Sequence, residues 1–325
     1  MICLGIDGTA HTFSVGIVND DGKILSNERS VYKPPLGKGI IPNDALEHHK
    51  RNCEIVLQNA LTKANLKIGD VDILAYSAGP GIPPPLIFTA DFALELSKKI
   101  NKPLIPVNHC IAHLEIGKLT TKTNDPLFVY LSGGNTQIIA LVGGKYRIFG
   151  ETQDISVGNS FDTVARELAL PMPGGPEIEK LAKQGKYVDL PYVVKGMDVS
   201  LTGITTAAIK KFKEGVPKSD ICYSLQETCF AMLVEITERA VAHTGKEEIL
   251  LVGGVAANKR LQEMLKNMCN ERGCKFYVVP QEYSGDQGAM IAWTGLLEYK
   301  SGWGQKMKNK VNPNWRIDDA EVNWT

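Results

Sequence analysis

Two similar arrangements of short apolar runs open the two halves of the chain. Residues 2–6 and 13–18 are apolar and strand-sized, and the small polar turn between them predicts a β-hairpin. The same order recurs in residues 127–131 and 137–142, around a glycine-rich turn at 132–136. The two units begin about 125 residues apart, which is too long for the repeat of a solenoid. We therefore expect a duplicated domain.

Helical and strand-like segments alternate through the rest of the chain. Helices are expected at residues 44–66, 86–99, 159–170, 219–243, 259–272 and 288–300. Strands are expected at residues 71–76, 104–107, 249–252 and 275–280, and residues 172–205 form a loop-rich stretch. Strands that alternate with helices favour an α/β fold.

The length and these patterns predict two lobes and a tail. We expect an N-terminal lobe at residues 1–125, a C-terminal lobe at 126–300, and a linker or docking strap at 301–325. The last helix, about 288–300, could pack back onto the first lobe. From Ser301 onward the chain loses its periodicity, which argues against a further folded domain in that stretch.

Composition and charge narrow the class of protein. The chain has 325 residues, of which 43% are hydrophobic and 22% charged, which excludes intrinsic disorder and coiled coil. No apolar run approaches the roughly 20 residues of a membrane span, and Asp7 comes too early for a signal peptide. The seven cysteines include no Cys-x-x-Cys pair, which fits reduced thiols. We expect a cytoplasmic protein without membrane contact.

Two histidines, His109 and His113, follow a predicted strand. In a helix this spacing places both imidazoles on one face, close enough to share a metal ion. Capping or packing at a helix start would explain the pair as well. A zinc peptidase would need a glutamate directly after the first histidine as its general base, and Cys110 occupies that position. A metallopeptidase is therefore disfavoured.

Three glycine turns follow predicted strands, at residues 7–12, 132–136 and 253–258. Such turns let backbone amides approach a phosphate closely. Together they resemble the two phosphate loops and the adenosine loop of the actin-like ATPase fold. The sequence contains neither a Gly-x-x-x-x-Gly-Lys-[Ser/Thr] P-loop nor a Gly-x-Gly-x-x-Gly dinucleotide fingerprint.

Three acidic residues lie near predicted helix starts or beside a predicted turn. Asp286 precedes the last helix, where an N-cap role is sufficient on its own. Asp162 and Glu179 lie on either side of a rigid Pro-Gly-Gly-Pro turn at 173–176. Their carboxylates could accept hydrogen bonds from ribose hydroxyls or an ammonium group, or they could simply oppose the helix dipole.

Five motifs occur in a fixed order and are more specific together than any one alone. They are Gly-Ile-Asp-Gly-Thr-Ala-His at 5–11, Val-Asn-His-Cys-Ile-Ala-His at 107–113, Leu-Ser-Gly-Gly-Asn-Thr-Gln at 131–137, Pro-Gly-Gly-Pro-Glu-Ile-Glu at 173–179 and Gly-Gly-Val-Ala-Ala-Asn at 253–258. Over residues 2–300 they closely resemble the tRNA N6-adenosine threonylcarbamoyltransferase family, specifically the archaeal and eukaryotic catalytic subunit of the KEOPS complex.

The resemblance implies a fold and an activity. The fold is α/β, a two-lobed actin-like ATPase (ASKHA) fold of duplicated RNase H-like domains with a nucleotide cleft between them. The activity is acyl transfer: the threonylcarbamoyl group of threonylcarbamoyl-adenylate moves to N6 of the adenosine beside the anticodon (position 37) in tRNAs that read codons beginning with A, and AMP leaves. A small-molecule kinase or a non-catalytic ATP-binding scaffold of the same fold is the alternative.

The resemblance also assigns site residues. The metal ligands are His109, His113, Tyr130 and Asp286. Two imidazoles, a carboxylate and a phenolate, with no thiolate, suit one divalent or trivalent ion, iron first and zinc second. The adenine nucleotide, threonylcarbamoyl-AMP or ATP itself, is assigned to Tyr130, Leu131, Ser132, Gly133, Gly134, Asp162, Gly175, Glu179 and Asn258. Asp7 and His11 are candidate auxiliary groups in the first turn.

The implied partners are tRNA and the other KEOPS subunits. These are the small atypical kinase, which some archaea fuse to the C-terminus of this subunit, a small dimerisation subunit and a tRNA-binding subunit. The chain carries 36 basic and 36 acidic side chains, and its two small basic runs, at 210–213 and 306–310, can be ordinary solvated surface. Because phosphate contacts dominate nucleic-acid affinity, we expect weak tRNA binding by the chain alone.

Overall fold

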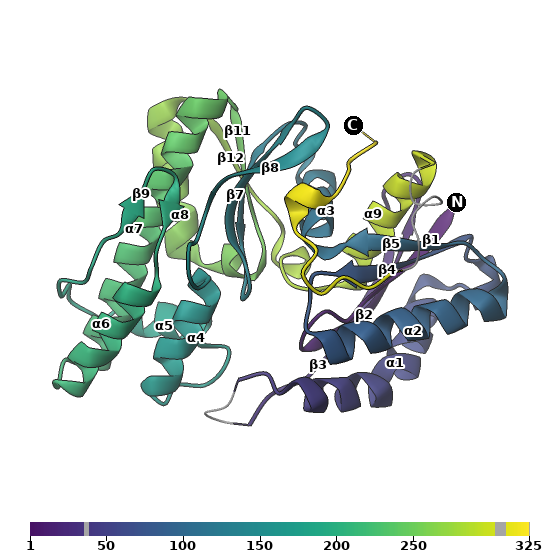
Figure 1. Ribbon diagram of the computed structural model, residues 1–325, viewed down its shortest axis with the longest axis horizontal. Helices are drawn as coiled ribbons and strands as arrows, with labels where there is room; N and C mark the ends of the chain where they lie inside the picture. The colour runs from purple at the N-terminus through teal and green to yellow at the C-terminus, as the bar shows by residue number, and fades with distance from the viewer. Residues whose placement is uncertain (36–38, 303–309, 325) are drawn as a thin grey trace.

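A computed structural model describes residues 1–35, 39–302 and 310–324, and it has two lobes, each built on a five-stranded mixed sheet (Figure 1). The first sheet has the order β3-β2-β1-β4-β5. Its strands are β1 (Ile2–Asp7), β2 (Thr12–Asn19), β3 (Ile24–Val31), β4 (Ile73–Gly79) and β5 (Leu104–Asn108). The first three form an antiparallel meander, and β4 and β5 run parallel to β1.

The second sheet repeats this plan with the order β12-β11-β6-β7-β8. Its strands are β6 (Leu127–Leu131), β7 (Thr136–Val142), β8 (Lys145–Glu151), β11 (Glu248–Val252) and β12 (Lys275–Val278). Again three antiparallel strands are followed by two parallel ones. The shared topology confirms the α/β class and the duplicated, two-lobed arrangement. A small ribbon, β9 (Val194–Lys195) with β10 (Asp198–Val199), lies outside both sheets.

Helices cover the sheets. They are α1 (Pro42–Ala64), α2 (Pro83–Ile100), α3 (His109–Thr121), α4 (Val157–Glu167), α5 (Gly174–Ala182), α6 (Thr202–Lys213), α7 (Lys218–Thr244), α8 (Lys259–Arg272) and α9 (Gly288–Lys300), with short 3-10 turns η1 (Ile68–Asp70), η2 (Gly254–Ala257), η3 (Gln281–Tyr283) and η4 (Ile317–Asp319). In the first lobe α1 and α2 share one apolar core with one face of the sheet, and α3 and α9 share another with the opposite face. Figure 1 shows α3 between the two lobes.

Helix α9 packs against bare backbone of the first sheet. A Cβ placed on Gly5 would lie 2.2 Å from the amide nitrogen of Ala292, and one on Gly16 would lie 2.1 Å from that of Ala289. Gly5 and Gly16 are paired neighbours on β1 and β2, so together they form a flat seat for the helix. This close packing brings the start of α9, and the loop before it, to the edge of the first sheet.

Helix α3 belongs to the cores of both lobes. Its residues Ala112 and Ile116 lie in the core cluster beneath α9, whereas Ile111 and Leu114 lie in the core of the second lobe. The two sets face opposite ways because they fall on different sides of a helix of 3.6 residues per turn. The chain after Lys310 also crosses between the lobes, with Val311 packed on the first core and Ile317 buried in the second.

The predicted strands and long helices are present, and the structure adds elements that the pattern did not predict. The stretch 172–205, expected to be loop-rich, contains α5 and the start of α6, so that prediction was partly wrong. Strands β3 and β8 were not predicted. The division at residues 125 and 300 stays a prediction. Of the second basic run, residues 306 and 308 lie outside the described residues.

Candidate metal centre and nucleotide site

The start of helix α3 fixes the two histidines. Asn108 ends β5 and caps the helix: its side-chain oxygen accepts hydrogen bonds from the backbone N–H groups of Cys110 and Ile111 at 3.0 and 3.1 Å. His109 is therefore the first residue of the helix, and His113 follows one turn later. Their ring centroids lie 4.8 Å apart. The helical geometry that the spacing required is thus present.

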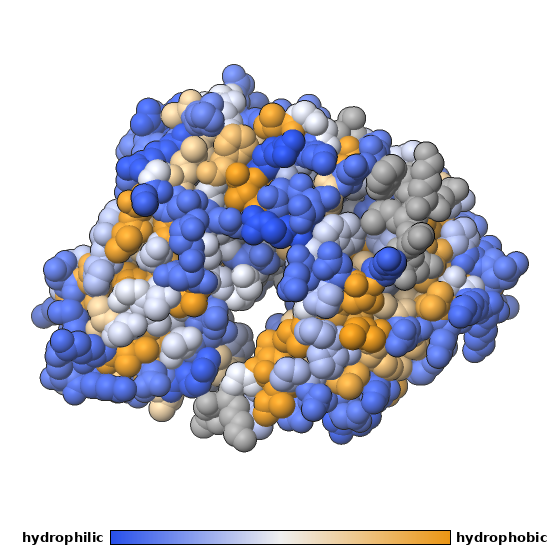
Figure 2. All heavy atoms as spheres, viewed as in Figure 1, coloured by the Kyte–Doolittle hydropathy of each residue, from blue (hydrophilic) through white to orange (hydrophobic). Residues whose placement is uncertain are grey.

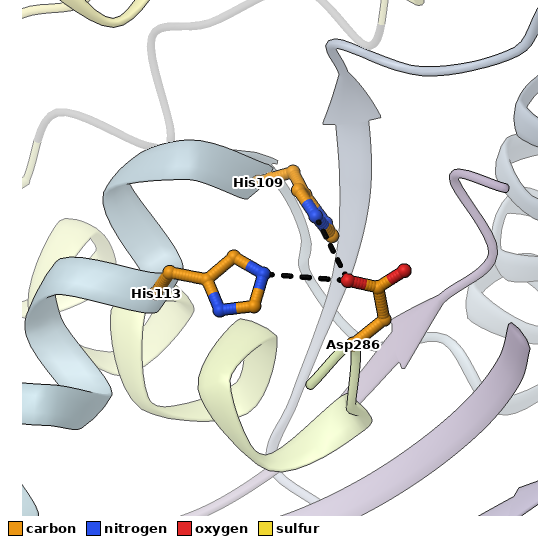
Figure 3. A group of neighbouring side chains, drawn as sticks. All are labelled: His109, His113 and Asp286. Atoms are coloured by element: carbon orange, nitrogen blue, oxygen red, sulfur yellow. Dashed lines mark ion pairs between the residues drawn. The ribbon is translucent and has the colours of Figure 1, made fainter. Parts of the chain in front are cut away.

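Asp286 completes a group of three donors (Figure 3). Its Oδ1 lies 3.5 Å from Nε2 of His109 and 3.4 Å from Nε2 of His113. The three ligand atoms all lie within 4.8 Å of one another. Asp286 reaches this point from the loop before α9, so residues far apart in the sequence meet because both helices pack on the same face of the first sheet.

Asp7 holds the far side of the His109 ring. Its Oδ1 lies 2.9 Å from Nδ1 of His109, and the hydroxyl of Thr9 lies 3.4 Å from the same nitrogen. A carboxylate on Nδ1 favours the tautomer whose Nε2 lone pair faces Asp286. Asp7 was expected beside phosphates as an auxiliary group. The structure places it behind a candidate ligand, a contact across 102 residues that no local sequence signal could indicate.

The three donors strongly perturb one another. Burial lowers the pKa of His109, but the carboxylates of Asp7 and Asp286 outweigh burial and raise that pKa well above its ordinary value. Burial lowers the pKa of His113, which Asp286 only partly offsets. For Asp286, burial raises the pKa, but the two histidines dominate and hold it well below its ordinary value. The carboxylate is therefore ionised, with the protonated ring of His109 on one side and the neutral ring of His113 on the other.

The donor set fits a metal ion. Nε2 of His113 is buried and has no hydrogen-bond partner among the described residues, although it points at Asp286 Oδ1. A buried polar nitrogen without a hydrogen-bond partner lowers the stability of the folded protein, and a bound metal ion would remove this cost. Two imidazole nitrogens and a carboxylate oxygen, with a second carboxylate behind one imidazole, are a usual ligand set for iron or zinc.

Tyr130 lies beside the three donors. It is fully buried at the end of β6, with its ring centroid 5.4 Å from that of His113. Its hydroxyl lies 3.8 Å from the sulfur of Cys110 and accepts a hydrogen bond from Asn135 at 3.4 Å. Burial, Cys110 and Asp286 together raise the pKa of the phenol well above its ordinary value. Its assignment as a fourth ligand stays a prediction.

The loop that carries Asp286 is anchored to β3. Asn27 donates a hydrogen bond to the side-chain oxygen of Gln287 at 2.6 Å and accepts one from the backbone N–H of Ala289 at 3.3 Å. Gln287 is completely buried at the N-cap of α9. These contacts fix the residue directly after the candidate ligand. Neither Asn27 nor β3 was singled out in the sequence, because β3 reads as a polar stretch.

The turn after β6 has the form expected of a phosphate loop. The hydroxyl of Ser132 accepts hydrogen bonds from the backbone N–H groups of Gly134 and Asn135, at 3.3 and 3.0 Å. A Cβ placed on Gly133 or Gly134 would meet nothing within 4 Å, so the outer side of the turn is open. Leu131 is buried just before it. Figure 2 shows a hollow between the two lobes.

The remaining predicted nucleotide residues lie in the second lobe. Asp162 of α4 accepts the N–H of Gly174 at 2.7 Å, and burial raises the pKa of its carboxyl. Glu179 of α5 accepts the N–H of Lys259 at 2.9 Å, which ties α5 to the start of α8.

Asn258 and Gly175 complete this set. Asn258 caps α8 through the N–H of Leu261 and donates to Gln226 at 3.1 Å. Gly175 has open space where a Cβ would be. Their role with a nucleotide stays a prediction. His11, the other auxiliary candidate, has a buried Nδ1 without a hydrogen-bond partner among the described residues.

Comparison with known proteins identifies the family. Residues 23–293 match the family model described as tRNA N6-adenosine threonylcarbamoyltransferase. A protein of that name from Thermococcus sibiricus is 53% identical over all of both chains, and one from Methanopyrus kandleri is 51% identical over all of this chain and 96% of its own length. The chain belongs to this family.

Family membership establishes the activity class that the motifs predicted. The threonylcarbamoyltransferase is an enzyme, a transferase that modifies adenosine N6 in tRNA. A "Probable bifunctional tRNA threonylcarbamoyladenosine biosynthesis protein" of Methanocaldococcus jannaschii is 55% identical, and this chain spans 60% of its length. No helix in the described ranges is both long and apolar enough to cross a bilayer.

Solved structures agree with the actin-like fold. HypF of T. kodakarensis superposes with a TM-score of 0.63 over 93% of this threonylcarbamoyltransferase and 48% of that chain, at 16% identity. Component A of the (R)-2-hydroxyglutaryl-CoA dehydratase of Acidaminococcus fermentans superposes with a TM-score of 0.59, over 92% of this chain and 99% of its own length, at 13% identity. At such identities the likeness concerns the fold alone.

Proposed function

We propose that His109, His113 and Asp286 hold one metal ion, which would help to orient threonylcarbamoyl-adenylate for attack by N6 of adenosine 37 in tRNA. The observation that carries the proposal is the meeting of three donor atoms within 4.8 Å, with Asp7 on the far nitrogen of His109. When bound, the ion would act as a Lewis acid: it would hold oxygen atoms of the threonylcarbamoyl group and polarise the carbonyl of that group. Iron is the first candidate and zinc the second.

The residues around this centre would position the donor. Asp7 holds the proton on Nδ1 of His109, so Nε2 is the nitrogen that would coordinate the ion once its own proton is displaced. The hydroxyl of Ser132 accepts the N–H groups of Gly134 and Asn135 and so fixes the shape of the turn at 132–136, whose open glycine side would meet the phosphate of the adenylate. Glu179, Asn258 and Gly175 in the second lobe would take the nucleoside, with Asp162 supporting the turn before α5.

The chemical step then needs little from the protein besides positioning. The N6 amine attacks the carbamoyl carbon, the bond from that carbon to the phosphate oxygen breaks, and AMP leaves with the electron pair while the amine loses a proton. AMP is a good leaving group, so no side chain has to act as a nucleophile. Holding both reactants in the correct orientation supplies the larger part of the rate.

We infer that other subunits work with this chain. Relatives named as bifunctional biosynthesis proteins contain a second part, and the chain spans 60% of one of them. The second part of these relatives would be a small kinase, which in other cases would be a separate subunit. Further KEOPS subunits would provide dimerisation and tRNA binding. An equal number of acidic and basic side chains supports a need for partners in tRNA binding.

Reconstitution tests the proposal. The chain and its partners are incubated with tRNA, threonine, bicarbonate, ATP and an adenylate-forming enzyme, and the metal content is measured by inductively coupled plasma mass spectrometry. We expect His109→Ala to lose the metal and at least a hundredfold in transfer rate. His243→Ala, an exposed histidine at the end of α7, is the matched control and should change neither. Unchanged transfer by His109→Ala would reject the metal-centred mechanism.

A further inference from the structure

The C-terminal strap, residues 310–324, joins the two lobes. Val311 and Trp315 pack against the core of the first lobe. A few residues later Ile317, Ala320 and Val322 are buried in the core of the second lobe. The segment is therefore a packed part of the molecule, although its sequence has none of the periodicity of a helix or a strand.

The strap contacts the residue that starts helix α3. The side-chain N–H of Asn108 donates to the backbone oxygen of Trp315, 3.3 Å away. The oxygen of the same amide is occupied by the N–H groups of Cys110 and Ile111. The cap thus fixes which way the amide faces, and the nitrogen is directed to the strap. Asn108 is almost fully buried, so this donor has no access to bulk water.

A second contact is made two turns further along the same helix. Glu115 is 3% exposed, and its Oε1 accepts a hydrogen bond from the indole N–H of Trp324 at 3.1 Å. The hydroxyl of Tyr146 donates to the same oxygen at 2.5 Å. A buried carboxylate without these donors would be costly. The two candidate ligands, His109 and His113, lie between the two contacts that the strap makes with α3.

A third contact of the strap is with the loop before α2, and this loop contacts the turn that faces Nδ1 of His109. The backbone N–H of Gly81 donates to the oxygen of Pro313 at 3.1 Å, and the N–H of Ile82 donates to the oxygen of Thr9 at 2.7 Å. The hydroxyl of Thr9 in turn lies 3.4 Å from Nδ1 of His109. The strap therefore supports both the helix that carries the ligands and the turn that faces the far nitrogen of one of them.

We propose that the C-terminal strap is a positioning element for the metal centre: by holding Asn108, Glu115 and the loop at Gly81, it sets the angle at which α3 presents His109 and His113 to Asp286. This inference rests on the proposed metal centre. Positioning contacts behind metal ligands typically account for a factor of 10 to 100 in metal affinity. The strap then acts on the reaction without touching a substrate.

The test separates these contacts from the general stability of the strap. Asn108→Ser keeps a good N-cap oxygen but removes the donor to Trp315, and Trp324→Phe keeps the ring but removes the donor to Glu115. The control is Arg316→Ala on the same strap, which removes exposed ion pairs to Glu151 and Asp318 and leaves α3 untouched. Cobalt(II) affinity is measured on the full chain by absorbance titration, and exchange of the α3 amides by hydrogen–deuterium mass spectrometry.

We expect the variant carrying both substitutions to bind cobalt at least tenfold more weakly and to exchange the amides of residues 110–117 at least tenfold faster, while Arg316→Ala resembles the wild type. Unchanged affinity and exchange would overturn the proposal, as would equal losses in the control. If the wild type binds no cobalt, the proposed metal centre fails by itself. The exchange rates then decide the role of the strap: faster exchange supports it and unchanged exchange overturns it.

Discussion

Asp7 is the side chain whose role depends most on a single contact, its 2.9 Å approach to Nδ1 of His109. Asp7→Asn keeps an acceptor at this position but removes the charge that makes the imidazole a stronger ligand. We expect metal affinity to fall about 10- to 100-fold, measured by competition with a chelator. Asp72→Asn, whose carboxylate accepts the N–H of Ile2 far from the site, is the control and should bind metal normally. Equal affinities in both variants would contradict the role given to Asp7.

A second histidine group, away from the metal centre, makes stability depend on pH. His49 is completely buried on α1 against the ring of Phe13. Burial first, and then the nearby His48 and His11, lower its pKa from 6.5 to about 4. Between pH 6.5 and about pH 4, His49 is protonated in the unfolded chain but stays neutral in the folded chain. The stability is therefore complete above pH 6.5 and is lost as the pH falls towards 4.

His49→Leu tests this dependence. We expect the free energy of unfolding of the wild type to fall by about 3 kcal/mol more than that of the variant between pH 7 and pH 4. Urea unfolding of both proteins in the presence of a chelator measures the difference. Parallel pH profiles would show that His49 is not the responsible group.

Single residues also show how far the sequence could predict the site. The spacing of His109 and His113 indicated a shared face, which the helix confirms, because this pattern needs only local geometry. Asp286 alone read as an N-cap, and only resemblance to a family joined it to the histidines. Asp7 and Asn27 were missed in their present roles because their partners lie 102 and 260 residues away. Such contacts follow from how the sheet is assembled, which no short window contains.

At the level of elements, the seat of α9 on Gly5 and Gly16 controls where Asp286 lies. Gly16→Ala would place a Cβ 2.1 Å from the backbone of Ala289, so the helix must move. We expect the free energy of unfolding to fall by about 1–3 kcal/mol, measured by urea denaturation, together with weaker metal binding.

Gly203→Ala is the matched control for this substitution. Gly203 is exposed in the first turn of α6, and a Cβ there would meet nothing within 4 Å. Alanine in an exposed helical position is neutral or stabilising by roughly 0.5–1 kcal/mol. Equal destabilisation by both substitutions would contradict the seat described for α9.

The elements that the pattern missed have a common physical cause. β3 is an edge strand in which only Ser26 is buried, so its sequence lacks the apolar alternation of a strand. Helix α5 begins with Gly174, Gly175 and Pro176, which read as a turn although proline is favoured in a first helical turn. In both cases neighbouring elements stabilise a segment whose own composition favours another structure.

For the whole molecule, the balance of charge sets an expectation for tRNA. With 36 basic and 36 acidic side chains, the isolated chain should bind tRNA only in the range of non-specific contacts, with a Kd of roughly 10⁻⁶ M or weaker at physiological salt. Filter binding at several salt concentrations measures this. Addition of the partner subunits should tighten binding. Tight, strongly salt-dependent binding by the chain alone would contradict the need for partners.

Helix α9 and helix α3 both pack on the first sheet, whereas Ser132, Gly175, Glu179 and Asn258 belong to the second lobe. The three donors are therefore held by elements that pack on the first sheet, and the predicted nucleotide residues belong to the second lobe. If the halves swing apart after transfer, spent AMP can diffuse away while the three donors keep their mutual spacing. Turnover would then proceed without reloading of the ion.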